Sequence, residues 1–209
     1  MDSPNKIIVA GIGTGVGKTI VSAILTKMLQ GDYWKPVQCG DQDTVAVTQW
    51  LDPSSHTVHP SHYTLKEFVS PHHAARLEDF FIQPEKIIPP QTKRPLIIEG
   101  VGGILVPLTL DTLTIDLFSS WNARWVVVSN HYVGSINHTL LTLEALKQRK
   151  ISVAGIIFNG VPNPDSEAAI LTQSDLPVIG RLFPEKNIDS TIIQRYAKKW
   201  HSNLSLLQQ

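Results

Sequence analysis

The sequence lacks several features that would place it in a specialised class of protein. It contains one cysteine, Cys39, among 209 residues, which excludes a framework of internal disulfides. Its longest apolar runs, such as "WVVVS" and "AGIIF", are far shorter than the roughly 18 residues of a membrane-spanning helix. The opening "MDSPNKIIVAGIG" has no apolar segment of the signal-peptide type. We therefore expect a cytoplasmic protein that does not enter a membrane.

The sequence also lacks an excess of charge of either sign. Eighteen basic residues balance eighteen acidic ones, so no overall field attracts the chain to nucleic acid or to a membrane surface. With 42% apolar residues, a chain of this length can bury one substantial core, and no repeat or linker divides it. We expect a single domain over residues 1–209.

Apolar runs of strand length alternate with stretches of helical spacing. The runs are "KIIVAG", "PLIIEG", "WVVVSN" and "VAGIIFNG", and their continuous apolar character is typical of strands buried on both faces. The pattern predicts an α/β fold with a mostly parallel central sheet flanked by helices. Helices are predicted at residues 18–29, 43–51, 71–81, 135–149 and 190–200.

A glycine-rich turn follows the first of these runs. In "VAGIGTGVGKT", Gly17, Lys18 and Thr19 match the end of a phosphate-binding P-loop, whose lysine reaches the phosphates and whose hydroxyl binds Mg²⁺. Five residues separate Gly11 from Gly17, one more than in the standard motif. The turn indicates a P-loop NTPase-like fold, and the alternative is a strand-to-helix turn that binds nothing.

Two acidic residues are candidates for completing a magnesium site with Thr19. Glu99 ends an apolar strand, at the sheet edge where ligands bind in open α/β sheets, and Asp43 opens a predicted helix. Mg²⁺ prefers one or two carboxylates together with phosphate and water. Asp43 has an alternative role as a helix cap or first-turn acid, and Asp41 is its nearest rival as a ligand.

The segment "YWKPVQCG" places Lys35 at the end of a short apolar strand. A second cation there would neutralise a γ-phosphoryl group during transfer, although an ordinary surface lysine is the alternative. In "EGVGGILVPL", Gly102 and Gly103 follow the acidic strand end and allow backbone amides to approach a substrate closely.

Further residues carry weaker signals. The helix in "VGSINHTLLTLEALKQRK" could hold an anion at its first turn, where Asn137 and His138 could equally be capping or core residues. His56, His59 and His62 lie in a proline-rich loop with no cysteine partner, so zinc binding is not favoured. The pair "HH" at residues 72–73 opens a predicted helix, and Cys39 has no nearby base to make it a nucleophile.

Taken in order, six segments resemble the motif series of the dethiobiotin synthetase family. They are "GIGTGVGKT", "YWKPVQCG", "SPHHAA", "EGVGGILVPL", "GSINHTLLT" and "AGIIFNG", and the match runs from about residue 7 to residue 184. The resemblance implies an ATP- and Mg²⁺-dependent ligase that closes a ring on 7,8-diaminononanoate with CO₂ or bicarbonate, in biotin biosynthesis. It also accounts for the additional loop residue as a family trait.

The resemblance implies roles for individual residues. Lys18 and Lys35 would be catalytic, and the metal ligands would be Thr19, Asp43 and Glu99. The implied nucleotide contacts are Thr14, Gly15, Val16, Gly17, Lys18, Thr19 and Ile20 in the loop, with Asn159, Gly180, Leu182 and Pro184 around adenine. The implied substrate contacts are Thr14, Lys35, Cys39, Gly102 and Gly103, together with Gly134, Ser135, Ile136 and Asn137.

The resemblance further implies a homodimer, in which the helix start at residues 134–137 of one subunit receives the substrate tail bound to the other. The sequence departs from some members of the family at three positions: Gly15 replaces an acidic residue, Cys39 replaces serine or threonine, and Tyr132 replaces lysine. Two alternative functions are open, namely a related amidating P-loop ligase and a nucleotide switch that binds protein partners.

Overall fold

A computed structural model describes residues 6–40 and 42–207, whose main feature is a seven-stranded sheet. Its strands have the order β4-β2-β6-β1-β7-β8-β9, and every neighbouring pair is parallel. The strands are β1 (Lys6–Gly11), β2 (Asp32–Trp34), β4 (Val58–His59), β6 (Leu96–Gly103), β7 (Arg124–Asn130), β8 (Val153–Asn159) and β9 (Val178–Leu182). The predicted parallel sheet is confirmed.

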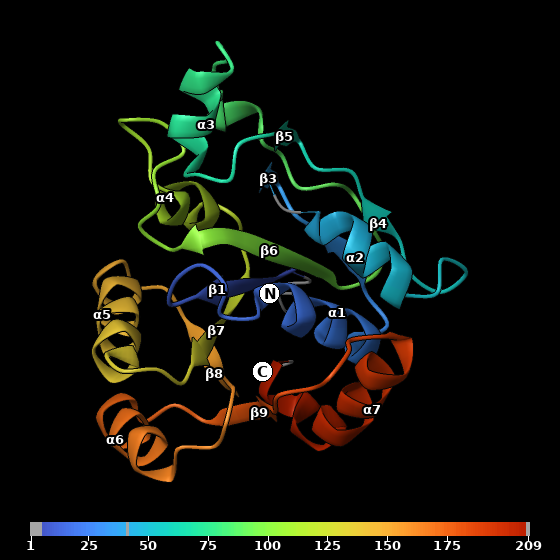
Figure 1. The fold of residues 1–209 in the computed structure, drawn as a ribbon, viewed down its shortest axis with the longest axis vertical. Coiled ribbons are helices and arrows are strands. Elements are labelled where there is room, and N and C mark those ends of the chain that lie inside the picture. The colour runs from blue at the N-terminus through green and yellow to red at the C-terminus, as the bar shows by residue number, and fades with distance from the viewer. Residues whose placement is uncertain (1–5, 41, 208–209) are drawn as a thin grey trace.

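Helices cover both faces of this sheet (Figure 1). One face packs against α1 (Lys18–Leu29), α2 (Asp43–Trp50) and α7 (Ser190–Trp200). The other face packs against α3 (Pro71–Leu77), α4 (Thr114–Ser119), α5 (Ser135–Gln148) and α6 (Pro164–Ser174). Short 3₁₀ helices, η1 (Pro84–Lys86) and η2 (His201–Leu207), complete the described helical elements.

Burial on both faces explains the continuous apolar runs. Along β1, Ile7 and Val9 pack toward α1, whereas Ile8 and Ala10 pack on the opposite side. Because β1 lies between β6 and β7, the chain leaves the middle of the sheet and enters the glycine-rich loop there. This order places the end of β1 beside the end of β6, with Val9 in register with Glu99.

A second, two-stranded parallel sheet pairs β3 (Val37–Cys39) with β5 (Tyr63–Leu65). It lies with α3 at one end of the molecule, near the top of Figure 1. The predicted helix 71–81 is too long, since α3 ends at Leu77. Asp79 has a left-handed backbone with φ 49°, and the Phe80 N–H donates to the Ala75 carbonyl at 2.8 Å, which closes the helix early.

The predicted helices at 43–51 and 135–149 each end one residue earlier in the structure. Two α-helices, α4 and α6, were not predicted from the sequence. No helix within residues 6–40 and 42–207 has the length and apolar character needed to cross a membrane.

Candidate active site

The glycine-rich loop connects β1 to α1, and its backbone requires glycine at two positions. Gly15 and Gly17 have φ of 72° and 96°, values that residues with a Cβ rarely adopt. Gly17 also lies against Asn159 at the end of β8, where an added Cβ would stand 2.4 Å from Nδ2. Asn159 Nδ2 donates to the Val16 carbonyl at 2.9 Å, so the end of β8 supports the loop.

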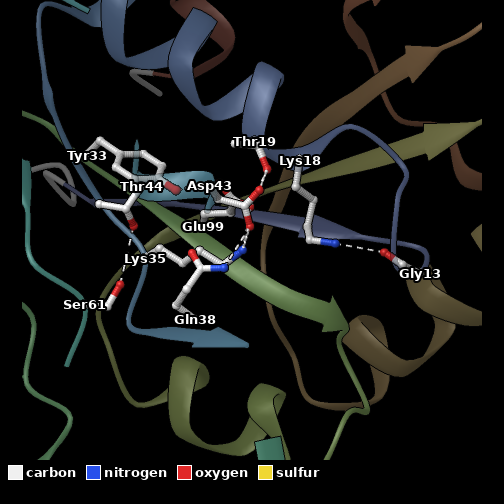
Figure 2. A network of polar contacts seen from close by, with 10 residues as sticks. All are labelled: Gly13, Lys18, Thr19, Tyr33, Lys35, Gln38, Asp43, Thr44, Ser61 and Glu99. Carbon is white, nitrogen blue, oxygen red and sulfur yellow. Dashed lines mark hydrogen bonds and ion pairs between the residues drawn. The ribbon is translucent and has the colours of Figure 1, made fainter. Parts of the chain in front are cut away.

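Lys18 folds back over the loop that precedes it. Its ammonium donates to the Gly13 carbonyl at 2.8 Å (Figure 2), and the side chain is buried. Burial lowers the pKa of Lys18 to about 8, although the nearby Glu99 carboxylate opposes the shift. Lys18 therefore holds a cation at the centre of the loop, where phosphate oxygens would be attracted.

Thr19, in the first turn of α1, faces two carboxylates from distant parts of the chain. Its Oγ1 lies 2.8 Å from Asp43 Oδ1 and 2.9 Å from Glu99 Oε1, and either oxygen can accept its single proton. Gln42 precedes α2 and makes no capping bond through its side chain. Asp43 is a first-turn acid of α2, as the alternative expected, and its carboxylate also bonds Thr19 and Lys35 in the site. Asp41 lies outside the described residues.

Lys35 follows β2 and forms ion pairs with both carboxylates (Figure 2). Its ammonium bonds Asp43 Oδ2 and lies 3.2 Å from Glu99 Oε1, and only 5% of the residue is exposed, unlike a surface lysine. Burial alone would lower the pKa of Lys35, but the two carboxylates outweigh it and raise the pKa above its usual value. The same pairing lowers the pKa of Asp43 against the effect of its own burial. Lys35 is therefore held in its charged form.

The donor set fits a hard divalent cation and a phosphate group. Thr19, Asp43 and Glu99 present only oxygen atoms, which Mg²⁺ prefers over nitrogen or sulfur. Gly13 and Gly15 have no heavy atom within 4 Å of the place where a Cβ would stand, so their backbone is open to an approaching anion. We conclude that these residues can hold Mg²⁺ together with nucleotide phosphates.

A cavity of about 480 Å³ joins these groups, a size typical of small-ligand sites. Most of the residues predicted for the phosphates, metal and reacting end of the substrate line it: Thr14, Gly15, Gly17, Lys18, Thr19, Ile20, Lys35, Cys39, Asp43, Glu99 and Gly102. Gly102 has φ 59°, and an added Cβ would stand 2.8 Å from Val106 and 3.5 Å from Thr14 Oγ1. The end of β6 therefore lies close to the phosphate loop.

Other predicted residues lie behind or beside this cavity. Val16 is a buried residue of the loop, and an added Cβ on Gly103 would stand 3.7 Å from the Gly13 Cα. Gly180 and Leu182 are buried in β9, and Pro184 is exposed just beyond it. None of these residues lines the cavity. The contact of Gly180, Leu182 and Pro184 with adenine stays a prediction, as do the contacts of Val16 with the nucleotide and of Gly103 with the substrate.

The start of α5 lies outside the cavity as well. Gly134 has φ 99° and precedes the helix, Ser135 is buried and Ile136 is half-buried. Asn137 is exposed and lines a separate cavity of about 580 Å³ along α5. The neighbouring His138 neither caps the helix nor enters the core, because its Nδ1 lies 2.8 Å from the Tyr132 hydroxyl near the surface.

The histidines of the proline-rich loop make separate contacts. His56 Nδ1 bonds the Gly31 carbonyl at 2.8 Å, His59 Nε2 lies 3.9 Å from Asp32 Oδ2, and His62 packs edge-on against Tyr63. Nowhere in residues 6–40 and 42–207 do three side chains of His, Cys, Asp or Glu converge as metal ligands. His72, at the start of α3, bonds Ser70.

Sequence reasoning missed several residues of the site. Phe68 and Val69 line the cavity but belong to none of the motifs described in the sequence. Val101 and Val106 also line it and lie within "EGVGGILVPL", where only the glutamate and the glycines were given a role. Tyr33 was also missed, although its hydroxyl donates to Glu99 Oε2 at 2.7 Å. Its place directly before Trp34 and Lys35 was the available signal.

Comparisons with known proteins show the family to which the chain belongs. A family model described as "AAA domain" matches residues 5–191. The ATP-dependent dethiobiotin synthetase BioD of Cytophaga hutchinsonii is 47% identical over 201 residues, covering 95% of this chain and 98% of the relative. The protein of the same name from Chlamydia pneumoniae is 45% identical over 195 residues, covering 93% and 89%.

Solved structures of lower identity share the fold. A plasmid partition protein of Borrelia burgdorferi has a TM-score of 0.56 at 10% identity, over 98% of this chain and 99% of that one. The septum site-determining protein MinD of Pyrococcus horikoshii, complexed with Mg-ADP, has a TM-score of 0.55 at 15% identity, over 97% and 92%. The fold is thus that of P-loop ATPases, and the sequence relatives are more specific: the chain belongs to the AAA-domain family and, within it, to the ATP-dependent dethiobiotin synthetases.

Proposed function

We propose that this chain is an ATP- and Mg²⁺-dependent cyclo-ligase that converts 7,8-diaminononanoate and CO₂ to dethiobiotin, with release of ADP and phosphate, in biotin biosynthesis. One observation carries the proposal: two buried lysines, Lys18 and Lys35, and the oxygens of Thr19, Asp43 and Glu99 surround one cavity, in a chain 47% identical to a named dethiobiotin synthetase. The cavity supplies cations for phosphates and open backbone for a small polar substrate.

The chemistry requires positioning and charge neutralisation more than acid–base catalysis. One amine of the substrate adds to CO₂ and forms a carbamate, and a carbamate oxygen then attacks the γ-phosphorus of ATP and displaces ADP. The second amine attacks the carbonyl carbon and closes the ring as phosphate leaves. In this scheme Lys18 and Lys35 would neutralise charge on the transferring phosphoryl group.

Three side chains would hold the divalent cation. A Mg²⁺ ion held by these side chains would supply positive charge to the nucleotide phosphates. Thr19 Oγ1, one oxygen of Asp43 and Glu99 Oε1 already face a common point, because the hydroxyl lies within 3 Å of both carboxylates. Gln38 Nε2, 3.4 Å from Asp43 Oδ2, helps to orient that carboxylate.

We propose the remaining features by the same resemblance. Residues 1–209 would act as one catalytic domain in the cytoplasm, where ATP is available, and as a homodimer whose α5 start contacts the substrate tail of the partner subunit. Gly180, Leu182, Pro184 and Asn159 would surround adenine. The position of Asn159 beside Gly17 supports its part in this arrangement, because the loop and the end of β8 are in direct contact.

The test is an assay of ADP release with MgATP and bicarbonate, in the presence and absence of 7,8-diaminononanoate. We expect release to depend on the diamine and dethiobiotin to appear in equal amount. Equal release in both tubes would contradict the ligase and favour the nucleotide switch. Release that depends on ammonia or glutamine instead of bicarbonate would favour the amidating ligase.

A further inference from the structure

Tyr33 is a fully buried tyrosine whose hydroxyl contacts a proposed metal ligand. Its side chain donates to Glu99 Oε2 at 2.7 Å, and both residues have almost no exposed surface (Figure 2). We infer that Tyr33 is a positioning residue for the metal site, which fixes the orientation of the Glu99 carboxylate. The inference rests on the proposed role of Glu99 as a magnesium ligand.

The parallel register of β2 and β6 places the two side chains on the same face. Tyr33 is in register with Ile97, and Glu99 stands two residues further along β6, so all three point toward α1. Tyr33 is therefore held by the sheet backbone and by the surrounding core. A donor fixed in this way can orient a carboxylate without itself being near the reacting atoms.

The two oxygens of Glu99 have different partners. Oε2 accepts from Tyr33, whereas Oε1 faces the Thr19 hydroxyl at 2.9 Å and the Lys35 ammonium at 3.2 Å. The oxygens of a buried carboxylate need hydrogen-bond partners. Because Tyr33 bonds Oε2, Oε1 is left to face Thr19 and Lys35. Glu99 would then coordinate Mg²⁺ through one oxygen, in a geometry set before the metal binds.

The experiment compares Tyr33→Phe with a matched control, Tyr63→Phe. The control also removes a phenol hydroxyl, but Tyr63 accepts a bond from the Gln83 N–H at 3.2 Å and lies outside the metal site. Mn²⁺ binding to the ADP-loaded protein is measured by electron paramagnetic resonance. We expect Tyr33→Phe to weaken Mn²⁺ binding by about tenfold or more, the usual effect of removing a partner behind a metal ligand.

Two further measurements distinguish a positioning role of Tyr33 from a general effect on the structure. ADP binding in the absence of divalent cations should be unchanged in Tyr33→Phe. In a Glu99→Gln background the same substitution should weaken Mn²⁺ binding no further, because it acts through that carboxylate. Wild-type Mn²⁺ affinity in Tyr33→Phe, or an equal additional loss in the Glu99→Gln background, would overturn the inference.

The wild-type protein offers a measurement that does not depend on whether Tyr33→Phe folds. The sequence has four tyrosines, so ¹³C-tyrosine signals can be assigned by elimination with phenylalanine variants of the other three. Mg²⁺ added with ADP should shift the Tyr33 signal, and an unshifted signal would refute the inference. These measurements use no diamine, so they can support the role of Tyr33 even if the ring-closing reaction is not observed. Equally, the reaction can be observed even if Tyr33 has no effect on metal binding.

Discussion

At the scale of single residues, the two lysines of the site are buried alike but differ in their electrostatic surroundings. The pKa of Lys18 is lowered by burial, whereas the pKa of Lys35 is raised because two carboxylates outweigh its burial. Lys35 thus remains charged while lying between groups that would also attract a divalent cation. In the proposed mechanism, this position would let Lys35 neutralise phosphate charge without being part of the phosphate loop.

Lys35→Ala should cut turnover by at least about tenfold, as expected for losing one cation that acts in the transition state. ATP binding should remain largely intact, because Lys18 and the loop backbone are unaltered. Turnover and ATP affinity are measured separately, with the exposed Lys93→Ala as control. Unchanged turnover in Lys35→Ala would remove this side chain from the mechanism.

Cys39 should react slowly with thiol reagents in the folded protein. Burial raises the pKa of its thiol from 9.0 to about 11 despite the nearby Lys35 ammonium. A shift of this size reduces the reactive thiolate about 100-fold at neutral pH, apart from any steric protection. Modification by 5,5′-dithiobis(2-nitrobenzoate) is compared in native and urea-unfolded protein, and equal rates would contradict the expectation.

At the scale of elements, the sequence predicted the helices that begin and end at local signals. The helix at 18–29 matches because Gly17 adopts the left-handed backbone before it, and that at 190–200 begins after Asp189, whose side chain caps the Ile192 N–H. Helix 71–81 was overestimated because the left-handed backbone at Asp79 ends it early. No residue pattern near Asp79 predicts the left-handed backbone at that position.

The sequence predicted the site residues that are charged or are glycines, but not those that are apolar. Lys18 begins α1 after the turn that follows β1, and Lys35 directly follows β2. Glu99 was expected to end its strand, but β6 continues to Gly103. Phe68 and Val106 reach the cavity only through loop conformations that no periodicity encodes. The Tyr33 bond to Glu99 depends on strand register, which the sequence does not specify.

Gly180→Ala should destabilise the packing of α7 on β9. A Cβ at Gly180 would stand 2.3–2.6 Å from three ring atoms of the buried Trp200, too close for either backbone or indole to adjust easily. We expect the free energy of unfolding to fall by about 1–3 kcal/mol, as for other overpacked cores. Urea unfolding measures this, with Gly13→Ala as control because no heavy atom lies within 4 Å of its added Cβ. Equal stability of the two variants would contradict the prediction.

At the scale of the whole molecule, strand order brings distant residues together. β2, β6 and β1 are neighbours in the sheet, so the residues that follow or end them meet at one edge. Lys35 and Glu99 come into contact in this way although they are 64 positions apart in the sequence. The start of α5 does not line the same cavity. In the proposed homodimer, the partner subunit would supply an α5 start for the substrate tail.

Mixing two inactive variants tests this proposed arrangement. Lys35→Ala disables its own site, and Gly134→Val should displace the start of α5, because a β-branched residue cannot adopt φ 99° without strain. A heterodimer contains one Lys35→Ala subunit and one Gly134→Val subunit. The Gly134→Val subunit has an intact Lys35, and the α5 start that completes its site comes from the Lys35→Ala subunit, where it is also intact. Random association should therefore restore about a quarter of wild-type activity.

The control for this experiment mixes Lys35→Ala with Glu99→Gln. These residues lie in the same subunit's site, so no combination yields an intact one, and activity should not return. Steady-state turnover is measured after co-refolding, and sedimentation confirms that dimers are present. Recovery in neither mixture, or a monomer that retains full turnover, would contradict a shared site, because each subunit would then have to bind the substrate tail with its own residues.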